Sequence, residues 1–256
     1  MSYVLLSFDV EEFDIPLEYG QNISLDEQLD IGIKGLQALD PILQNKNVET
    51  TLFTTANFAL HFKDHIRTLS ANHELASHTF YHSSYKTEDL LKSKITLEEI
   101  SGTPVIGLRM PRMKKVDMQD VIEAGYKYDS SINPTWLPGK YNNLNIPRKF
   151  FKAGGIVRMP ASVAPVIRLP LFWLGFKNYP YSTFLFLCKK AIAKDGYVCL
   201  YFHPWEFADI SNYKLPKYIK SPDGKLLVSR LEKLIKDLGK NKFISIKHFL
   251  EIKNAL

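Results

Sequence analysis

The chain has 256 residues, of which 45% are hydrophobic, so it is long enough to bury a sizeable core as one large domain or two small ones. The net charge of +6 comes from Lys and Arg residues spread along the whole length, and this dispersion argues against a nucleic-acid-binding surface. Two cysteines without metal-type spacing argue against a disulfide-rich domain.

Strand-like and helix-like segments alternate along the chain. The first strand is expected at residues 3–9, and Ser24-Leu25-Asp26-Glu27 then has the form of a capping box that begins a helix. Further strands are expected at 49–55, 74–78, 105–110, 126–132, 156–159, 197–202 and 243–246. Further helices are expected at 56–69, 87–100, 116–124, 182–194 and 225–238. This order predicts an α/β fold with a parallel sheet and favours its closure into a barrel.

No linker, repeat or change of composition marks a boundary, so residues 1–256 are expected to form a single domain. Residues 134–149 are richer in Pro, Gly and Asn and predict a long excursion from the regular alternation. The N-terminus has neither a basic start nor a small-residue cleavage site. We therefore expect no signal peptide in this chain and a cytoplasmic location.

No segment reaches the about 20 apolar residues that span a bilayer, so no transmembrane segment is expected. The nearest approach is 163–187, which Arg168, Pro170, Lys177 and Pro180 interrupt. This segment is interpreted as a core helix or covering loop. The alternative is a surface that makes peripheral contact with a membrane and meets a lipid-linked substrate.

Two carboxylates and two histidines stand next to predicted strands. Asp9 and Glu11 are two residues apart, and in an extended strand this spacing points both side chains to the same side of the sheet. His78 and His82 are four residues apart, a spacing that puts both on one face of a helical turn and suits a single metal ion. Thr79 stands where a zinc-peptidase motif requires Glu, which argues against that activity.

A second histidine pair has the same spacing. His61 and His65 lie within an amphipathic helical segment and lack a strand end before them, so they are interpreted as a surface feature. Arg109 and His203, by contrast, fall at the ends of predicted strands. Because the carboxyl ends of the strands build the active site in α/β barrels, these positions together predict a hydrolytic metal site.

The order of these motifs resembles the polysaccharide deacetylase family, which is carbohydrate esterase family 4 with its NodB-homology domain. The similar segments are Ser7-Phe8-Asp9, Glu74-Leu75-Ala76-Ser77-His78-Thr79-x-x-His82, Arg109-Met110-Pro111 and Phe202-His203. Tyr128-Asp129-Ser130-Ser131 and His203-Pro204-Trp205-Glu206 further resemble a subgroup associated with bacterial surface-polysaccharide synthesis. The resemblance implies a distorted (β/α) barrel with about seven strands. It also implies a metal-dependent hydrolase that removes N-acetyl, O-acetyl or formyl groups from sugars.

The resemblance also implies roles for the residues that match its motifs. Asp9 is expected to be the general base, His78 and His82 metal ligands, and His203 the acid that protonates the departing amine. Arg109 is expected to hold Asp9 ionised and oriented. One divalent ion is implied, with Zn²⁺ expected and Co²⁺, Mn²⁺ or Ni²⁺ as alternatives.

The chain departs from the family pattern at one position. Most members carry adjacent aspartates, the second of which binds the metal, whereas Val10 follows Asp9 here. Glu11 is expected to be the third ligand, because it shares a face with Asp9 and has a longer reach; Glu12 and Asp14 are alternatives. Asp129 is a candidate partner for His203, with a turn or cap role as the alternative.

The substrate is less closely defined. Tyr81, Trp136, Trp173 and Trp205 are candidate platforms for sugar rings, with packing in the core as the alternative for each. A chain in the cytoplasm favours an amino-sugar precursor linked to a nucleotide or a lipid. The alternative functions are an allantoinase-like amide hydrolase and a catalytically silent carbohydrate-binding relative.

Overall fold

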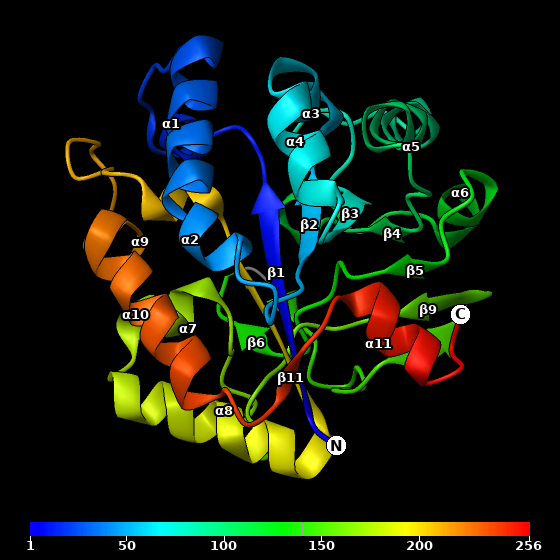
Figure 1. The fold of residues 1–256 in the computed structure, drawn as a ribbon, viewed down its shortest axis with the longest axis vertical. Coiled ribbons are helices and arrows are strands. Elements are labelled where there is room, and N and C mark those ends of the chain that lie inside the picture. Colours follow the sequence, from blue (N-terminus) through cyan, green and yellow to red (C-terminus); the bar gives the residue numbers. More distant parts are fainter. Residues whose placement is uncertain (140) are drawn as a thin grey trace.

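A computed structural model describes residues 1–139 and 141–256 of the chain. A curled, mostly parallel sheet forms its centre, and helices cover the outer face of the sheet (Figure 1). The strands of this sheet are β1 (Tyr3–Val10), β2 (Thr51–Thr54), β3 (Glu74–Ser77), β4 (Gly107–Leu108), β5 (Tyr128–Asp129), β8 (Phe151–Ala153), β9 (Ile156–Arg158), β10 (Tyr197–Phe202) and β11 (Lys242–Phe243). A separate hairpin pairs β6 (Trp136–Leu137) with β7 (Tyr141–Asn142).

The helices are α1 (Leu25–Ala38), α2 (Asp40–Leu43), α3 (Ala56–His61), α4 (Lys63–Ser70), α5 (Glu88–Ser101), α6 (Met118–Glu123), α7 (Trp173–Asn178), α8 (Tyr181–Asp195), α9 (Lys217–Lys220), α10 (Gly224–Asp237) and α11 (Ile246–Ile252). Three short 3-10 turns complete the set: η1 (Ile15–Tyr19), η2 (Pro111–Met113) and η3 (Pro204–Phe207). None of the helices among the described residues combines the length and apolar character needed to cross a bilayer.

The sheet runs in the order β10-β1-β2-β3-β4-β5-β9-β8. From β10 to β9 all seven strands are parallel, while β8 is antiparallel to β9 and β11 pairs with β1 beside this path. Ser162 bridges the gap between the β9 side and β10: its N–H donates to the carbonyl of Cys199 and its Oγ accepts the Cys199 N–H, both at 2.8 Å. The prediction of a distorted (β/α) barrel with about seven strands is therefore confirmed.

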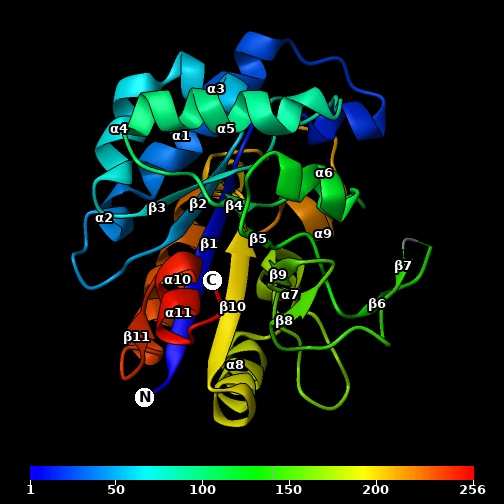
Figure 2. The same cartoon turned by 90° about the vertical axis from the view of Figure 1, so that its right-hand side faces the viewer.

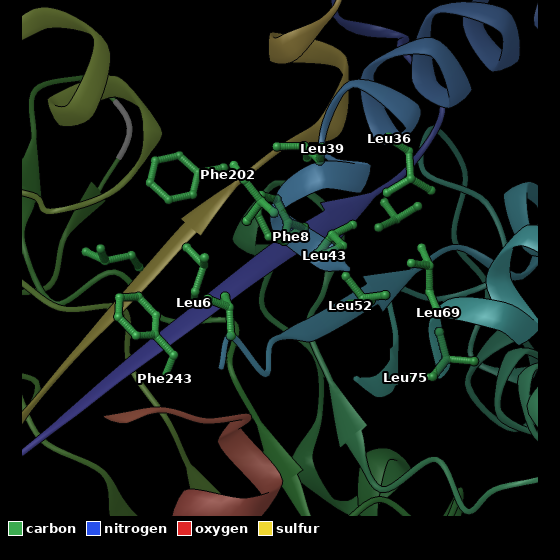
Figure 3. Close-up of a cluster of buried hydrophobic side chains, with 14 of the residues drawn as sticks. Leu6, Phe8, Leu36, Leu39, Leu43, Leu52, Leu69, Leu75, Phe202 and Phe243 are labelled. Carbon is green, nitrogen blue, oxygen red and sulfur yellow. The ribbon is translucent and has the colours of Figure 1, made fainter. Parts of the chain in front are cut away.

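Successive side chains of a strand point to opposite faces of the sheet, so the strands contribute to two hydrophobic cores, one outside the barrel and one inside it. In β1, Val4, Leu6 and Phe8 belong to the large cluster between the sheet and the helices, whereas Tyr3 and Leu5 belong to a second cluster inside the barrel. Figure 3 shows part of the outer cluster, where leucines of α1 and α2 meet the outward side chains of β1, β2 and β10. Each such side chain contributes about 1.5–3 kcal/mol when it is fully buried.

Several elements are shorter than expected, and two of the differences have a clear local cause. The helix expected at 56–69 is two helices, because the backbone leaves the helical region at Phe62 (φ −126°, ψ 43°) between α3 and α4. The strand expected at 243–246 ends at Phe243, because Ser245 caps α11: its Oγ accepts the His248 N–H at 3.1 Å. The capping box at the start of α1 is present in part, since the Ser24 Oγ accepts the Glu27 N–H at 3.2 Å.

The apolar segment 163–187 divides into core and surface. Leu171, Phe172, Phe176 and Phe184 are buried, as expected for a core helix and covering loop. The loop that precedes them exposes its apolar tip to solvent. The excursion expected at 134–149 contains the β6–β7 hairpin, apart from residue 140, which lies outside the described residues.

Candidate metal and catalytic site

The site lies where the inward-facing rows of several strands leave the sheet. Asp9 and Glu11 continue the inward row of β1 that begins with Tyr3 and Leu5, and both carboxylates are buried. His203 continues the inward row of β10 in the same way, after Tyr197, Cys199 and Tyr201. The carboxyl ends of the parallel strands thus bring acids and a histidine from distant parts of the chain to one end of the barrel.

Glu11, His78 and His82 converge on a common point. Oε2 of Glu11 lies 3.0 Å from Nε2 of His78 and 3.0 Å from Nε2 of His82. One ligand atom from each of the three residues lies within 4.8 Å of the other two. The structure therefore brings together the three residues that the sequence predicted as a ligand set.

The donor set fits a divalent cation. Oε2 of Glu11 and Nε2 of His78 are buried, and neither makes a hydrogen bond within the described part of the chain, although they are close together. A buried polar atom without a partner carries a free-energy cost that an ion would remove. Two imidazoles and one carboxylate are also the protein ligands of a well-known type of catalytic zinc site, which leaves a position open.

The histidine pair does not lie on a helix, contrary to the expectation from its spacing. Residues 78–82 form a loop after β3, in which Thr79 has a left-handed backbone (φ 64°). Hydrogen bonds hold this conformation, because the carbonyls of Thr79 and Phe80 accept the N–H groups of Ala56 and Asn57 at 3.0 and 2.9 Å. The two imidazole rings then stack at 5.6 Å with an angle of 17°.

Asp14 and Glu12, the alternative ligands, have other contacts. Oδ2 of Asp14 lies 2.8 Å from Nδ1 of His82, the ring nitrogen on the far side from Glu11. Arg112 in turn donates to Asp14 at 2.9 Å and to the His82 carbonyl at 3.1 Å. Glu12 accepts hydrogen bonds from Thr55 and Asn57 at 2.9 and 2.6 Å. Asp14 is thus placed to orient a ligand, and Glu12 is held away in the structure.

Arg109 fixes the orientation of Asp9. Its Nη1 donates to Oδ1 of Asp9 at 2.5 Å and to the Ser7 hydroxyl at 3.1 Å, while Nη2 donates to the Ser130 hydroxyl at 3.0 Å. The guanidinium is fully buried, and its carbon lies 4.0 Å from the centre of the Phe53 ring. Burial by itself would lower the pKa of Arg109, but the Asp9 carboxylate outweighs burial and raises it.

His203 faces Asp9 and Glu11 across the cavity. Its Nε2 lies 3.9 Å from Oδ2 of Asp9 and 3.9 Å from Oε1 of Glu11, too far for a hydrogen bond to either. Its other nitrogen, Nδ1, lies 3.0 Å from Oε1 of Glu206. The second oxygen of Glu206, Oε2, lies 3.6 Å from Nζ of the buried Lys177. Nε2 is thus directed to the cavity while Glu206 and Lys177 support the ring from behind.

Asp129 is not the partner of His203. Its carboxylate accepts hydrogen bonds from the Ser131 hydroxyl at 2.5 Å and from Nε of Arg158 at 2.9 Å. The partner that the sequence reasoning missed, Glu206, stands three residues after His203 within the His203-Pro204-Trp205-Glu206 motif. The spacing of a capping box, in which the third residue of a turn reaches back, was the available signal.

A cavity of about 160 Å³ joins these groups. Asp9, Glu11, His78, His82 and His203 line it. Aromatic and apolar residues complete the walls, namely Ile15, Leu137, Tyr141, Phe172, Trp173, Leu174, Tyr201 and Trp205. Of the four aromatic residues expected to contact a sugar ring, Trp173 and Trp205 line the cavity, whereas Tyr81 and Trp136 lie elsewhere on the surface.

Trp205 positions the Glu11 carboxylate, and the charges around Glu11 determine its ionisation. Trp205 Nε1 donates to Oε1 of Glu11 at 3.0 Å and its ring stacks on His203 at 4.9 Å, so this tryptophan positions both. Burial by itself would raise the pKa of Glu11. The charges of His82 and His203 and the contact with His78 outweigh burial and hold the pKa well below its usual range. Glu11 is thus ionised, the form that binds a cation.

No family model matches the sequence, and no curated protein matches it either. Solved structures do match the fold. A protein described as a polysaccharide deacetylase from Mycobacterium smegmatis is 18% identical, with a TM-score of 0.65 over 99% of this chain and 90% of its own. Another described as a polysaccharide deacetylase, from Pseudomonas aeruginosa PAO1, is 15% identical with a TM-score of 0.64, over 95% of this chain and 86% of its own.

The Puue allantoinase is similar as well, at 15% identity and a TM-score of 0.58, over 95% of this chain and 86% of its own. At such identities the likeness concerns the fold. The chain has the fold of the polysaccharide deacetylases of carbohydrate esterase family 4, as the sequence motifs implied.

Proposed function

We propose that this chain is a metal-dependent hydrolase that removes an N-acetyl or related acyl group from an amino sugar. The observation that carries the proposal is the convergence of Glu11, His78 and His82 in the same cavity as Asp9 and His203. A ligand set, a base fixed by a buried arginine and a histidine fixed by a buried glutamate are the parts that amide hydrolysis needs. The deacetylase fold supports the same reading.

A divalent cation held by Glu11, His78 and His82 would lower the pKa of a water molecule and polarise the acyl carbonyl. Asp9 has one oxygen committed to Arg109, and Oδ2 is left to accept the proton of the attacking water. The new C–O bond forms first and gives a tetrahedral adduct, and the C–N bond breaks when this adduct collapses. His203, as imidazolium, donates the Nε2 proton to the departing nitrogen, so that an amine leaves in place of an amide anion.

Glu206 supports the charged form of His203. Burial by itself would lower the pKa of His203, but the carboxylates of Glu11 and Glu206 outweigh burial and raise it. The imidazolium that the leaving amine requires is therefore favoured in this position. The same hydrogen bond fixes the ring so that Nε2, and not Nδ1, faces the cavity.

For the substrate we propose an amino-sugar precursor of a bacterial surface polysaccharide, linked to a lipid or a nucleotide. The aromatic walls of the cavity, among them Tyr141, Trp173 and Tyr201, suit the faces of a sugar ring. Zn²⁺ is the cation we propose, because imidazole and carboxylate ligands in this number are typical of it.

Two alternatives remain in view. An allantoinase-like amide hydrolase is favoured by the likeness to the Puue allantoinase and uses the same bond chemistry on a different substrate. A catalytically silent relative that binds carbohydrate would retain the fold without turnover. The complete set of Asp9, Arg109 and His203 around the ligand residues favours an active enzyme.

The test combines metal analysis with acyl release. We expect one divalent ion per chain, and acetate release from N-acetylhexosamine substrates, free and nucleotide-linked, that a chelator abolishes. His78→Ala should lose both the ion and the activity. His61→Ala is the matched control, because His61 has a partner histidine at the same spacing but lies on the exposed part of α3. Full activity in metal-free protein would refute the proposal, and turnover of allantoin alone would replace the substrate class.

A further inference from the structure

A lobe beside the cavity combines two segments that are far apart in sequence. We call it the rim lobe; it consists of residues 133–139, 141–146 and 163–170. Arg168 Nη1 donates to the carbonyls of Pro134 and Ile146 at 3.1 and 2.7 Å, and the Thr135 hydroxyl donates to the Arg168 carbonyl at 2.7 Å. Figure 2 shows the β6–β7 hairpin and the yellow-green loop before α7 on the same side of the molecule. The two segments thus form one unit.

The rim lobe exposes large apolar side chains. Val166 is 90% exposed, Ile167 64% and Trp136 58%. Val166 and Ile167 stand at the tip of a closed turn, in which the Ala164 N–H donates to the Leu169 carbonyl at 2.8 Å and the Arg168 N–H to the Ala164 carbonyl at 3.0 Å. An ordered turn that presents adjacent apolar side chains to solvent marks an interaction surface.

The stretch of chain that contains the rim lobe is basic. Residues 130–194 contain ten Lys and Arg and no Asp or Glu, whereas the rest of the chain carries 23 Lys and Arg against 27 Asp and Glu. Lys149 and Lys152, just after the hairpin, are exposed and make no ion pair within the described residues. Of the ten, Arg148, Arg158 and Lys177 pair with Asp195, Asp129 and Glu206. Lys189, Lys190 and Lys194 lie on α8. Lys149 and Lys152 are therefore left to meet an anionic partner beside the rim lobe.

The rim lobe is also a wall of the cavity. Leu137 and Tyr141 from the hairpin line it, and Phe172, Trp173 and Leu174 continue directly from the exposed loop into the lining. A surface that the exposed tips contact will therefore lie beside a wall of the cavity that holds Asp9 and His203.

We propose that the rim lobe docks on a membrane surface that contains anionic lipid, with Val166, Ile167 and Trp136 in the headgroup region. Exposed apolar side chains together with basic residues are the two signals that peripheral membrane binding combines. Docking in this way presents the cavity to a sugar carried by a membrane lipid. The delivery of such a substrate rests on the function proposed above, whereas the docking does not.

The charge argues for a membrane and against a second copy of the chain as the occupant. In a two-fold symmetric dimer the same surface patch meets itself. Two rim lobes would then bring the two copies of Lys149 and Lys152 towards each other, and residues 130–194 contain no acidic residue to balance them, which costs free energy. An anionic bilayer has the complementary charge.

Flotation with lipid vesicles tests the docking. We expect the protein to bind vesicles of phosphatidylcholine and phosphatidylglycerol, to bind less as salt rises, and to bind vesicles of phosphatidylcholine alone weakly. Val166→Asp/Ile167→Asp should weaken binding by about tenfold or more. Leu226→Asp is the matched control: Leu226 is similarly exposed but lies on α10, and its replacement should leave binding unchanged.

A second pair of variants tests the charge. Lys149→Glu/Lys152→Glu should weaken binding to the anionic vesicles, and Lys214→Glu/Lys217→Glu, exposed residues outside the basic stretch, should not. Absence of binding by the native chain, or equal binding by Val166→Asp/Ile167→Asp, would overturn the proposal. So would a dimer in light scattering that the Val166→Asp/Ile167→Asp change converts to monomer, because the occupant would then be a second copy.

The outcomes for docking and for catalysis are separable. His78→Ala should still bind vesicles, because His78 lies inside the cavity and not on the rim lobe. Val166→Asp/Ile167→Asp should release acetate from a soluble nucleotide-linked substrate at the native rate. If no substrate is turned over but vesicle binding follows the rim-lobe variants, the proposed function fails and the docking stands.

Discussion

Oε1 of Glu206 accepts two hydrogen bonds from the same residue, His203: the backbone N–H at 2.8 Å and the ring at Nδ1, 3.0 Å away. Both bonds arise because the chain turns into η3 immediately after β10, and this turn brings the Glu206 carboxylate back to His203, the residue that precedes η3. The second oxygen of Glu206 faces Lys177 at 3.6 Å, and both side chains are fully buried. A histidine with one nitrogen in the cavity is thus held by a buried ion pair.

Glu206→Gln should lower kcat by about tenfold or more, with little change in KM or in metal content, because Glu206 orients His203, the proposed acid, and contacts none of the proposed ligands. The variant also leaves Lys177 buried without a counter-ion, at a cost of about 3–5 kcal/mol. Lys177→Met/Glu206→Gln removes that charge as well and should regain stability in urea unfolding. If the double variant also regained kcat, Glu206 would have only a structural role.

Glu11→Gln should abolish the metal site, because the amide gives up the charge that two imidazoles surround. The loss of affinity should exceed the about 10–100-fold that changes behind a ligand cause. Calorimetric titration with Zn²⁺ measures it. Glu12→Gln is the control, since Glu12 is equally buried but bonded to Thr55 and Asn57. Native affinity in Glu11→Gln would assign the third ligand to another carboxylate.

Asp14→Asn should weaken metal binding by about 10–100-fold without removing a ligand, because Asp14 contacts Nδ1 of His82 and so fixes which nitrogen faces Glu11. The same titration applies. Glu18→Gln provides the comparison: Glu18 also pairs with Arg112, at 2.5 Å, but stands at the exposed rim of the cavity. Equal effects of the two changes would mean that Arg112, and not the contact with His82, is what matters.

The fold and much of the site follow from simple periodicity. The spacing of Asp9 and Glu11 predicts that both lie on one side of the sheet, and His203 is expected at a strand end; the structure places all three at the ends of inward-facing rows. The family resemblance added the order of the motifs and the barrel. Both succeed for residues such as Asp9 and His203, because the strand that carries each residue determines where it lies.

The parts that the sequence did not predict depend on contacts between distant segments. The loop of His78 and His82 is held by the first turn of α3, so the spacing of four residues alone pointed to a helix that is absent. The sequence motif contains Glu206 but does not assign it a role, because a carboxylate three residues from a histidine has many conformations until η3 selects one. Lys177 lies on α7, and nothing in the local sequence links it to Glu206.

The burial of Glu74 leads us to expect that the stability of the fold depends on pH, independently of the proposed metal site. It is buried inside the barrel and accepts hydrogen bonds from Thr51, Tyr128 and the Lys247 N–H at 2.7, 2.8 and 3.0 Å. Burial raises its pKa above the ordinary 4.5, and the hydrogen bonds oppose burial only in part. The folded state therefore holds the proton more tightly than the unfolded state, so this stability is complete below pH 4.5 and is lost as the pH rises through the folded pKa.

Glu74→Gln removes that loss while keeping the size of the side chain. The difference in unfolding free energy between Glu74→Gln and the native chain should therefore move in favour of the variant as the pH rises above 4.5. Urea unfolding at a series of pH values measures it. Glu232→Gln, on the exposed side of α10, controls for the loss of a carboxylate from the surface. A difference for Glu74→Gln that does not change with pH would show that burial leaves this carboxylate's ionisation unaffected.

Gly35 couples the outer helix layer to the segment that follows His203. A Cβ atom at this position of α1 would lie 2.0 Å from the carbonyl oxygen of Pro204 and 2.5 Å from its carbon, so α1 packs directly on the backbone of η3. Gly35→Ala should therefore cost about 1–3 kcal/mol of stability, more than the up to about 1 kcal/mol that alanine gains in a helix. Because Pro204 follows His203 directly, acetate release should fall as well. Gln37→Ala, on the exposed side of the same helix, should change neither thermal unfolding nor activity. A Gly35→Ala protein with native stability and turnover would contradict the close contact between α1 and η3.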